Sequence, residues 1–370
     1  MSYNNINKND LRRNRFVCCR YEIGKLLHDK ALLIFIALCL CLNICLCFID
    51  NYTKDAVNAL SSSDFAQSGE KIFDDLDSSA LGAAYYNERY INSSALDRCI
   101  KEKYERLQSS VDILDDNNAD LSFYAGEFTP AVHTALFEYQ LKALTAECIV
   151  FLSLLCLRAF SEELRSRTGD IVYSSRRGRD IAIDKIIADG IVGLLYCSAL
   201  IIASLAVFFK SWNFAGLWDM NVASSFNYIH DTNDAIYMKP FITWADMTVK
   251  NYFICSVLLI ASILAVWWMI SNITALFICN ELAGGLFIAA LLCLPYFGLM
   301  IFPELHLSVP FFISTLTIST VIYYSHMWFT DLGCYTIIEY QEVLIIIAHL
   351  AVSALIVVCG IKYFKRKELL

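Results

Sequence analysis

The sequence predicts an all-α membrane protein with six transmembrane helices, an N-terminal amphipathic elbow helix and a small, mainly helical extracellular domain between spans 1 and 2. Three observations support this fold class. The chain of 370 residues is 57% hydrophobic and only 18% charged. Its mean hydropathy of +0.51 places it outside the soluble globular class. Six windows also approach the roughly 20 apolar residues that a helix needs to cross about 30 Å of hydrocarbon.

The N-terminal segment, residues 1–30, is mostly polar and leads into the first span, residues 31–49. Within it, Phe16, Cys19 and Ile23 share one helical face, while basic side chains occupy the other. This pattern predicts an elbow helix that lies along the inner membrane surface. No small-residue cleavage site closely follows the apolar run, so we expect a retained signal anchor.

The predicted extracellular domain, residues 50–138, is acidic, with seventeen Asp and Glu against seven Lys and Arg. Such a surface attracts cationic ligands, or it is simply solvated. Ser94 and Asp97 offer a helix start signal. Apolar residues recur after it at intervals of three and four, which predicts one amphipathic helix. These residues are Leu96, Ile100, Tyr104, Leu107, Val111 and Leu114.

The rest of the chain alternates apolar spans with polar or aromatic connections. A shorter apolar run, residues 311–323, has the length expected of a re-entrant or interfacial helix. The predicted order is span 2 at 141–160, a cytoplasmic segment at 161–185, span 3 at 186–209, an aromatic-rich extracellular loop at 210–250, span 4 at 252–270, span 5 at 282–302, an extracellular segment at 303–342, span 6 at 343–361 and a cytoplasmic tail at 362–370.

Basic residues orient the predicted spans. Of the 29 Lys and Arg, 18 lie before residue 31, in or beside residues 161–185, or in the tail. Between Glu304 and Glu342 there is none. Because cytoplasmic loops carry the excess of Lys and Arg, we expect both termini and residues 161–185 to be cytoplasmic. The expected location is a bacterial cell membrane.

The sequence carries no motif for covalent chemistry or cofactor binding. It has no G-x-x-x-x-G-K-[ST], HExxH or G-x-S-x-G, and no zinc-ligand spacing. We therefore expect neither an enzyme nor a cofactor, metal or nucleic-acid partner. Of the fifteen cysteines, only Cys99 and Cys334 fall outside in this topology, and the sequence leaves their pairing open.

Two ionisable residues fall at membrane depth, where charge is costly and a functional role is the default hypothesis. Glu147 lies in the second span and His349 in the sixth. Either residue could face a substrate path. The structural alternatives are that Glu147 pairs with Lys142 or faces an outer vestibule, and that His349 hydrogen-bonds to a neighbouring helix.

Residues 161–185, SEELRSRTGDIVYSSRRGRDIAIDK, form a charged segment between two apolar spans. The segment resembles the corresponding segment in the permease subunits of type-2 ABC exporters. The six-span layout and the basic tail also resemble those of that family. Two departures are the reversed order of Thr168 and Gly169 and the absence of a Pro near Ser175. The matching positions are Phe160, Glu163, Ser174 or Ser175, Arg179, Ile181 and Lys185.

The resemblance implies that residues 161–185 couple the membrane helices to a separate cytoplasmic ABC ATPase subunit, and that the permease works as a dimer in the lipid bilayer. An apolar patch within a charged loop is typical of a protein contact. The alternatives are a solvated loop that only sets topology, a membrane sensor or immunity protein that binds a cationic extracellular ligand, and a multi-spanning enzyme. The implied contact residues are Glu162, Glu163, Tyr173, Ser174, Ser175, Arg176, Arg177 and Arg179.

Overall fold

The regular elements of the described structure are helices. The computed structural model describes residues 8–49, 54–55, 73, 76–78, 94–119, 132–168, 171–172, 178–214, 216–225 and 241–366. Within these ranges the elements are helices, and extended pairing is limited to two isolated bridges, Asn221 with Thr248 and Thr243 with Thr330. The prediction of an all-α fold is confirmed.

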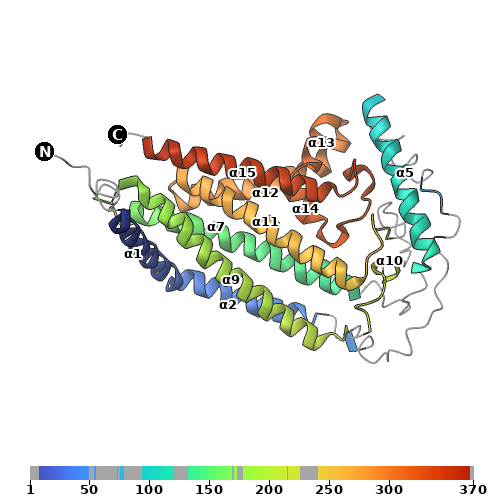
Figure 1. The fold of residues 1–370 in the computed structure, drawn as a ribbon, viewed down its shortest axis with the longest axis horizontal. Coiled ribbons are helices and arrows are strands. Elements are labelled where there is room, and N and C mark those ends of the chain that lie inside the picture. The colour runs from blue at the N-terminus through green and yellow to red at the C-terminus, as the bar shows by residue number, and fades with distance from the viewer. Residues whose placement is uncertain are drawn as a thin grey trace.

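The helices follow one another back and forth along the long axis of the molecule (Figure 1). Their order and bounds are α1 Lys8–Leu27, α2 Lys30–Leu46, α5 Ser94–Asp116, η3 Thr134–Gln140, α7 Leu141–Arg165, η4 Gly178–Asp180, α9 Ile181–Ser211, α10 Val222–Ser225, α11 Val249–Phe277, α12 Glu281–Glu304, α13 Ser308–Thr315, α14 Ile318–Tyr323, η5 Ser325–Met327, η6 Gly333–Tyr335 and α15 Gln341–Arg366.

Among the described residues, five helical runs are long and apolar enough to cross a membrane, and a bent pair makes a sixth if it counts as one span. The five are η3 with α7, then α9, α11, α12 and α15. The bent pair is α1 and α2, which meet at an angle of 53°. At the bend, Asp29 caps α2 by accepting a 2.9 Å hydrogen bond from the Ala31 backbone N–H, so a new helix starts there. These runs contain the apolar core of each predicted span.

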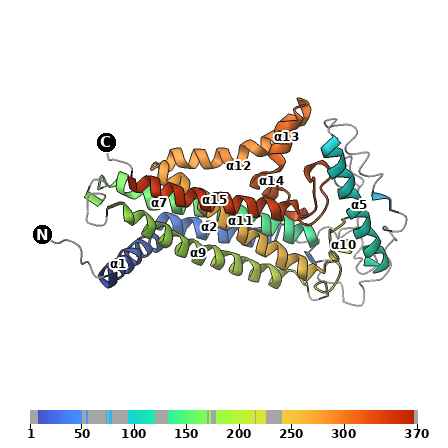
Figure 2. The same cartoon turned by 45° about the horizontal axis from the view of Figure 1, so that its top comes forward.

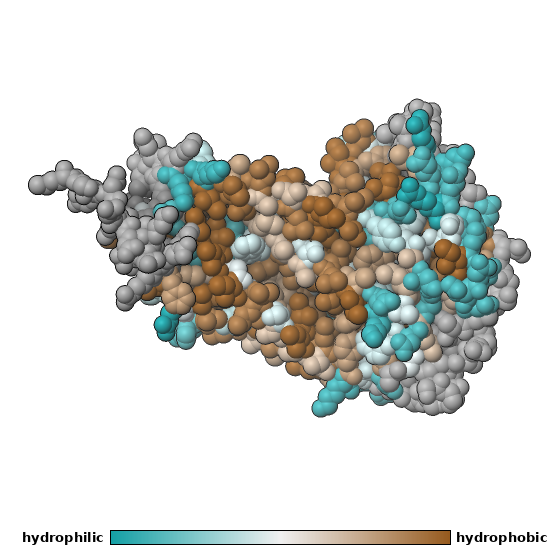
Figure 3. Space-filling view, viewed as in Figure 1, coloured by the Kyte–Doolittle hydropathy of each residue, from teal (hydrophilic) through white to brown (hydrophobic). Residues whose placement is uncertain are grey.

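The molecule has two distinct ends. Figures 1 and 2 place α1 and the end of α15 at one end, here called the terminal end, and α5 at the other, here called the α5 end. On the face shown in Figure 3, hydrophobic side chains form a broad band between these ends, and polar side chains gather over α5. Such a band is what a multi-pass protein presents to hydrocarbon.

Helix α7 is the centre of the bundle. It packs against α2, α9, α11 and α12. In its most apolar window 67% of residues are buried, against 17–33% in the other four candidate spans. The surrounding helices therefore keep apolar faces exposed, as expected where lipid rather than water is the neighbour.

The predicted short apolar run, residues 311–323, is divided between α13 and α14. Thr317, between them, has an extended backbone, which separates a helix of eight residues from one of six. Neither is long enough to cross a bilayer. Both lie at the α5 end, beside the end of α12 (Figure 2).

Candidate functional site

A buried ion pair joins the two ends of the segment 161–185. Lys185 Nζ in α9 lies 2.6 Å from Glu163 Oε1 in α7, and the two side chains are only 1% and 8% exposed. The same ammonium donates to the backbone carbonyl of Ala159 and lies 5.6 Å from the centre of the Phe160 ring. Because an unpaired charge is costly at this depth, the pair holds α7 and α9 together where the segment leaves the bundle.

Three further polar contacts tie this region to other helices. Ser161 Oγ donates to Glu281 Oε1 of α12 at 2.7 Å. Lys365 of α15 lies 2.5 Å from Asp180. Arg158 Nε lies 2.6 Å from Asp29 Oδ2, at the bend between α1 and α2. The terminal ends of α2, α7, α9, α12 and α15 are thus connected through residues in or beside the segment 161–185.

The implied ATPase-contact residues are described only in part. Residues 173–177 and the side chain of Arg179 lie outside the described residues. Glu162 is part-exposed and pairs with Arg165 at 2.5 Å. Glu163 lies under the surface in its pair with Lys185. Of the two acidic side chains, Glu162 is therefore the one that reaches the surface.

At membrane depth, Glu147 bonds to α2 rather than to Lys142. Its Oε2 accepts a 2.5 Å hydrogen bond from Asn43 Nδ2, and Asn43 is fully buried. The Lys142 ammonium instead lies 4.6 Å from the centre of the Tyr323 ring. Glu147 falls near the middle of the helical run Thr134–Glu163, so its half-buried carboxyl sits far from either end.

The contact of Glu147 extends into a chain of polar side chains. Gln140, the last residue of the π-helix η3, donates from Nε2 to Asn43 Oδ1 at 2.8 Å. The Cys47 thiol lies 3.7 Å from Gln140 Oε1. Asn43 also donates to the Cys39 carbonyl at 2.8 Å. The hydrogen bonds of such buried amides can all form in only one register of the helices. This row of polar side chains therefore fixes how α2 packs against η3 and α7.

His349 does not reach another helix through the contact that the structure records. Its Nδ1 lies 2.8 Å from the Ile345 carbonyl, one turn earlier in α15. The structure shows no contact between His349 and Glu147, so the two predicted path residues do not form one site. Glu147 has a polar partner on a second helix, and it is the stronger candidate.

A second buried ion pair lies at the α5 end, and sequence reasoning missed it. Lys103 Nζ lies 2.7 Å from Asp331 Oδ1, with the side chains 0% and 2% exposed. Lys103 also donates to the Gly333 and Thr336 carbonyls, at 3.0 Å each. The sequence carried one sign that Lys103 is buried. Lys103 stands four residues before Leu107 and therefore shares the apolar face of α5.

Two buried histidines, His133 and His326, contact each other. His133 Nε2 bonds to the His326 carbonyl at 2.9 Å, and Tyr252 donates to the same oxygen at 3.2 Å. Burial, with a smaller effect of the Lys142 charge, lowers the pKa of His326 to about 4. Burial also lowers the pKa of His133 well below its usual value. Both imidazoles are therefore neutral near pH 7.

The comparisons with known proteins leave the family open. No family model, no curated protein and no solved structure matched the chain. Among the described residues, no group of three or more His, Cys, Asp or Glu is placed to hold a metal ion. The arrangement itself offers buried ion pairs that link helix ends, and the Glu147 carboxyl near the middle of the run Thr134–Glu163.

Proposed function

We propose that the chain is the membrane-spanning permease subunit of an ATP-driven exporter. A separate cytoplasmic ATPase subunit supplies the energy, because the sequence has no phosphate-cradling loop. The segment 161–185 receives the ATPase, and the permease works as a dimer with both termini in the cytoplasm. The resemblance leaves lipids, polysaccharides, peptides, drugs and ions as substrates, and the elbow-helix role of α1 belongs to the same proposal.

The observation that supports this proposal best is the set of contacts around the segment 161–185. A push on the segment acts on α7 and α9 through Glu163 and Lys185, on α15 through Asp180, and on α12 through Ser161. A loop that only set topology would need its positive charges, but it would not need these contacts. The network gives a rigid mechanical connection between a cytoplasmic partner and most of the spans.

In the proposed path, Glu147 supplies a polar side chain at bilayer depth. Asn43 orients its carboxyl from α2. A half-buried carboxyl at this depth is costly unless it meets water, a cation or a polar substrate. In the proposed mechanism, rotation of α2 and α7 together changes access to this carboxyl.

The test is association with an ATPase encoded beside the permease gene. The two chains are co-expressed and purified through a tag on the permease, and ATP hydrolysis is measured in liposomes. Replacing Tyr173, Arg177 and Arg179 together with Ala should remove both association and stimulation. The control replaces Lys362 and Tyr363, which are exposed at the same end, and should change neither. Unchanged association and hydrolysis in the triple variant would refute the coupling role.

A second candidate is a sensor or immunity protein that binds a cationic extracellular ligand. It is favoured by the exposed acidic side chains of α5, Glu102, Glu105, Asp112 and Asp116. A cationic peptide should then bind the purified chain without any ATPase, and binding should weaken with added salt. Replacing the four carboxylates with amides should abolish that binding, whereas export coupling should survive the same change.

A further inference from the structure

An apolar groove with a volume of about 560 Å³ runs between α9 and α11. The two helices pack along α7, which forms the floor of the groove through Leu141, Leu144 and Leu152. One wall comes from α9, between Ile186 and Ile201. The other comes from α11, between Val257 and Trp268. The groove therefore lies at membrane depth.

The two helices touch at both ends of the groove and leave a space between these contacts. At the terminal end, the Trp268 indole N–H donates to Asp189 Oδ1 at 2.7 Å. Toward the α5 end, the rings of Phe209 and Phe253 lie 5.6 Å apart. Between these points the walls carry several small side chains, which leave the space unfilled. They are Ser198, Ala261 and Ala265.

The groove opens sideways and offers no polar recognition. Ile187, Ile191 and Leu194 line it and remain 44%, 48% and 74% exposed, which marks its open edge. The Ser198 hydroxyl is occupied by the Leu194 carbonyl of its own helix, at 2.6 Å. An empty space of this size would forfeit dispersion contacts along its whole lining, so in a bilayer it must be filled by an apolar group.

The dimensions decide what that group is. The α9 wall spans fifteen residue steps, which is about 22 Å at 1.5 Å per residue. A long groove lined by aliphatic side chains and open along one edge suits an extended hydrocarbon chain. A helix of a second copy, at least about 10 Å across with its side chains, would instead pack over the open edge and leave the floor unfilled.

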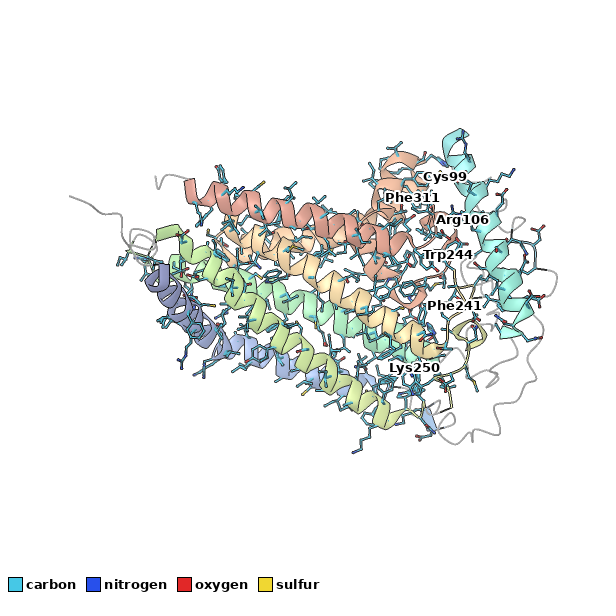
Figure 4. All side chains as sticks on the ribbon, viewed as in Figure 1. Cys99, Arg106, Phe241, Trp244, Lys250 and Phe311 are labelled. Atoms are coloured by element: carbon cyan, nitrogen blue, oxygen red, sulfur yellow. The ribbon has the colours of Figure 1, made fainter. Side chains whose placement is uncertain are left out.

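Exposed lysines flank the α5 end of the same two helices. Lys210 lies in the last turn of α9, and Lys250 lies in the first turn of α11, where Figure 4 labels it. Long basic side chains near helix ends extend to the headgroup region. Lys250 lies about two turns before Val257, on the groove face of α11, whereas Lys210 lies about two and a half turns beyond Ile201, on the opposite face of α9. The charge of Lys250 complements the phosphate of a phospholipid rather than a neutral lipid.

We propose that the groove between α9 and α11 binds one acyl chain of a bilayer phospholipid, with the phosphate toward Lys250. The bound chain completes the packing of α9 and α11 on α7. This inference stands independently of the proposed export function, since it rests on the shape and lining of the groove. It requires neither an ATPase nor a transported substrate.

The test is native mass spectrometry of the full chain purified in mild detergent. We expect one retained phospholipid per chain. Replacing Ala261 and Ala265 together with Phe fills the groove and should remove the lipid. The matched control, Ile254→Phe with Leu258→Phe, places the same rings on exposed positions of α11 outside the groove, and should retain it. Ser198→Leu is a smaller filling change that should also lower lipid retention.

Fluorescence provides a second readout that is insensitive to losses during purification. In a variant whose only tryptophan is Trp268, phospholipids with brominated acyl chains should quench emission, and the Ala261→Phe, Ala265→Phe change should reduce the quenching. Equal lipid retention and quenching in the filled and control variants would overturn the proposal. A wild-type chain free of lipid, or a dimer that dissociates when the groove is filled, would also overturn it.

Discussion

Lys103 of α5 and Asp331 of the loop before η6 form a buried ion pair, with Nζ and Oδ1 2.7 Å apart across 228 residues of sequence. The pair holds α5 against the ends of the membrane helices. Ser110 strengthens this contact by donating to the Trp244 carbonyl at 3.0 Å. In Figure 4, Arg106 and Trp244 lie along the same contact between α5 and the bundle.

Replacing Lys103 with Met should destabilise the protein strongly. The change leaves the Asp331 carboxylate buried without its cation, which costs on the order of 3–5 kcal/mol. Thermal unfolding of the detergent-solubilised protein measures the effect. Arg106→Ala is the control, because its pair with Glu339 is exposed and is worth about 1 kcal/mol or less. Adding Asp331→Leu to Lys103→Met should recover part of the loss, and no recovery would contradict this account.

Replacing Glu163 with Gln should weaken the mechanical connection between the segment 161–185 and the membrane helices. The Lys185 ammonium would keep the Ala159 carbonyl but lose the carboxylate of Glu163. We expect the ATPase to bind the variant while its hydrolysis is no longer stimulated, measured in liposomes against wild type. Glu162→Gln, one residue away on the part-exposed face, should leave stimulation intact. Equal stimulation in both variants would argue against mechanical coupling through this pair.

A cysteine at position 147 should be accessible from water. In a background without other cysteines, Glu147→Cys should react with a small, charged, membrane-impermeant thiol reagent, because the thiolate forms only where water reaches it. Val150→Cys, on the exposed face one turn further along α7, should react far more slowly if that face meets lipid. Mass spectrometry of labelled protein gives both rates, and equal labelling would remove Glu147 from the proposed path.

Acid should destabilise the α5 end through His326. Burial lowers the pKa of this imidazole to about 4, whereas the unfolded chain binds the proton near pH 6.5. The unfolded state therefore binds more protons between these values, and stability falls as the pH drops through them, by on the order of 3 kcal/mol in total. Unfolding temperatures at pH 7 and pH 5 test this. His326→Phe should reduce the difference, while His306→Gln should leave it unchanged.

The sequence predicted the helices better than their contacts. The amphipathic repeat from Ile100 to Leu114 identified α5, and Tyr104, Leu107 and Val111 are buried as the repeat indicates. Lys103 shows the limit of that reasoning. Its place on the apolar stripe was visible, but its partner Asp331 lies in a segment with no regular pattern.

Glu147 shows the same limit within the membrane. Hydropathy placed its carboxyl in the second span, and the choice between Lys142 and another partner stayed open. Only the packing of α2 against α7 brought Asn43 within 2.5 Å of it. The groove between α9 and α11 was invisible for a related reason, because its walls are two apolar spans whose separation depends on contacts at Asp189 and Phe253.

The sequence by itself determined that the chain is helical, how many long apolar segments it has, and where they lie. Hydropathy and helical periodicity act within one turn or one span, so neighbouring residues carry that information. Tertiary structure alone decided which charges are paired, which carboxyl bonds to which amide, and where two spans stand apart. Those outcomes depend on packing between segments far apart in sequence, where desolvation makes every unpaired polar group costly.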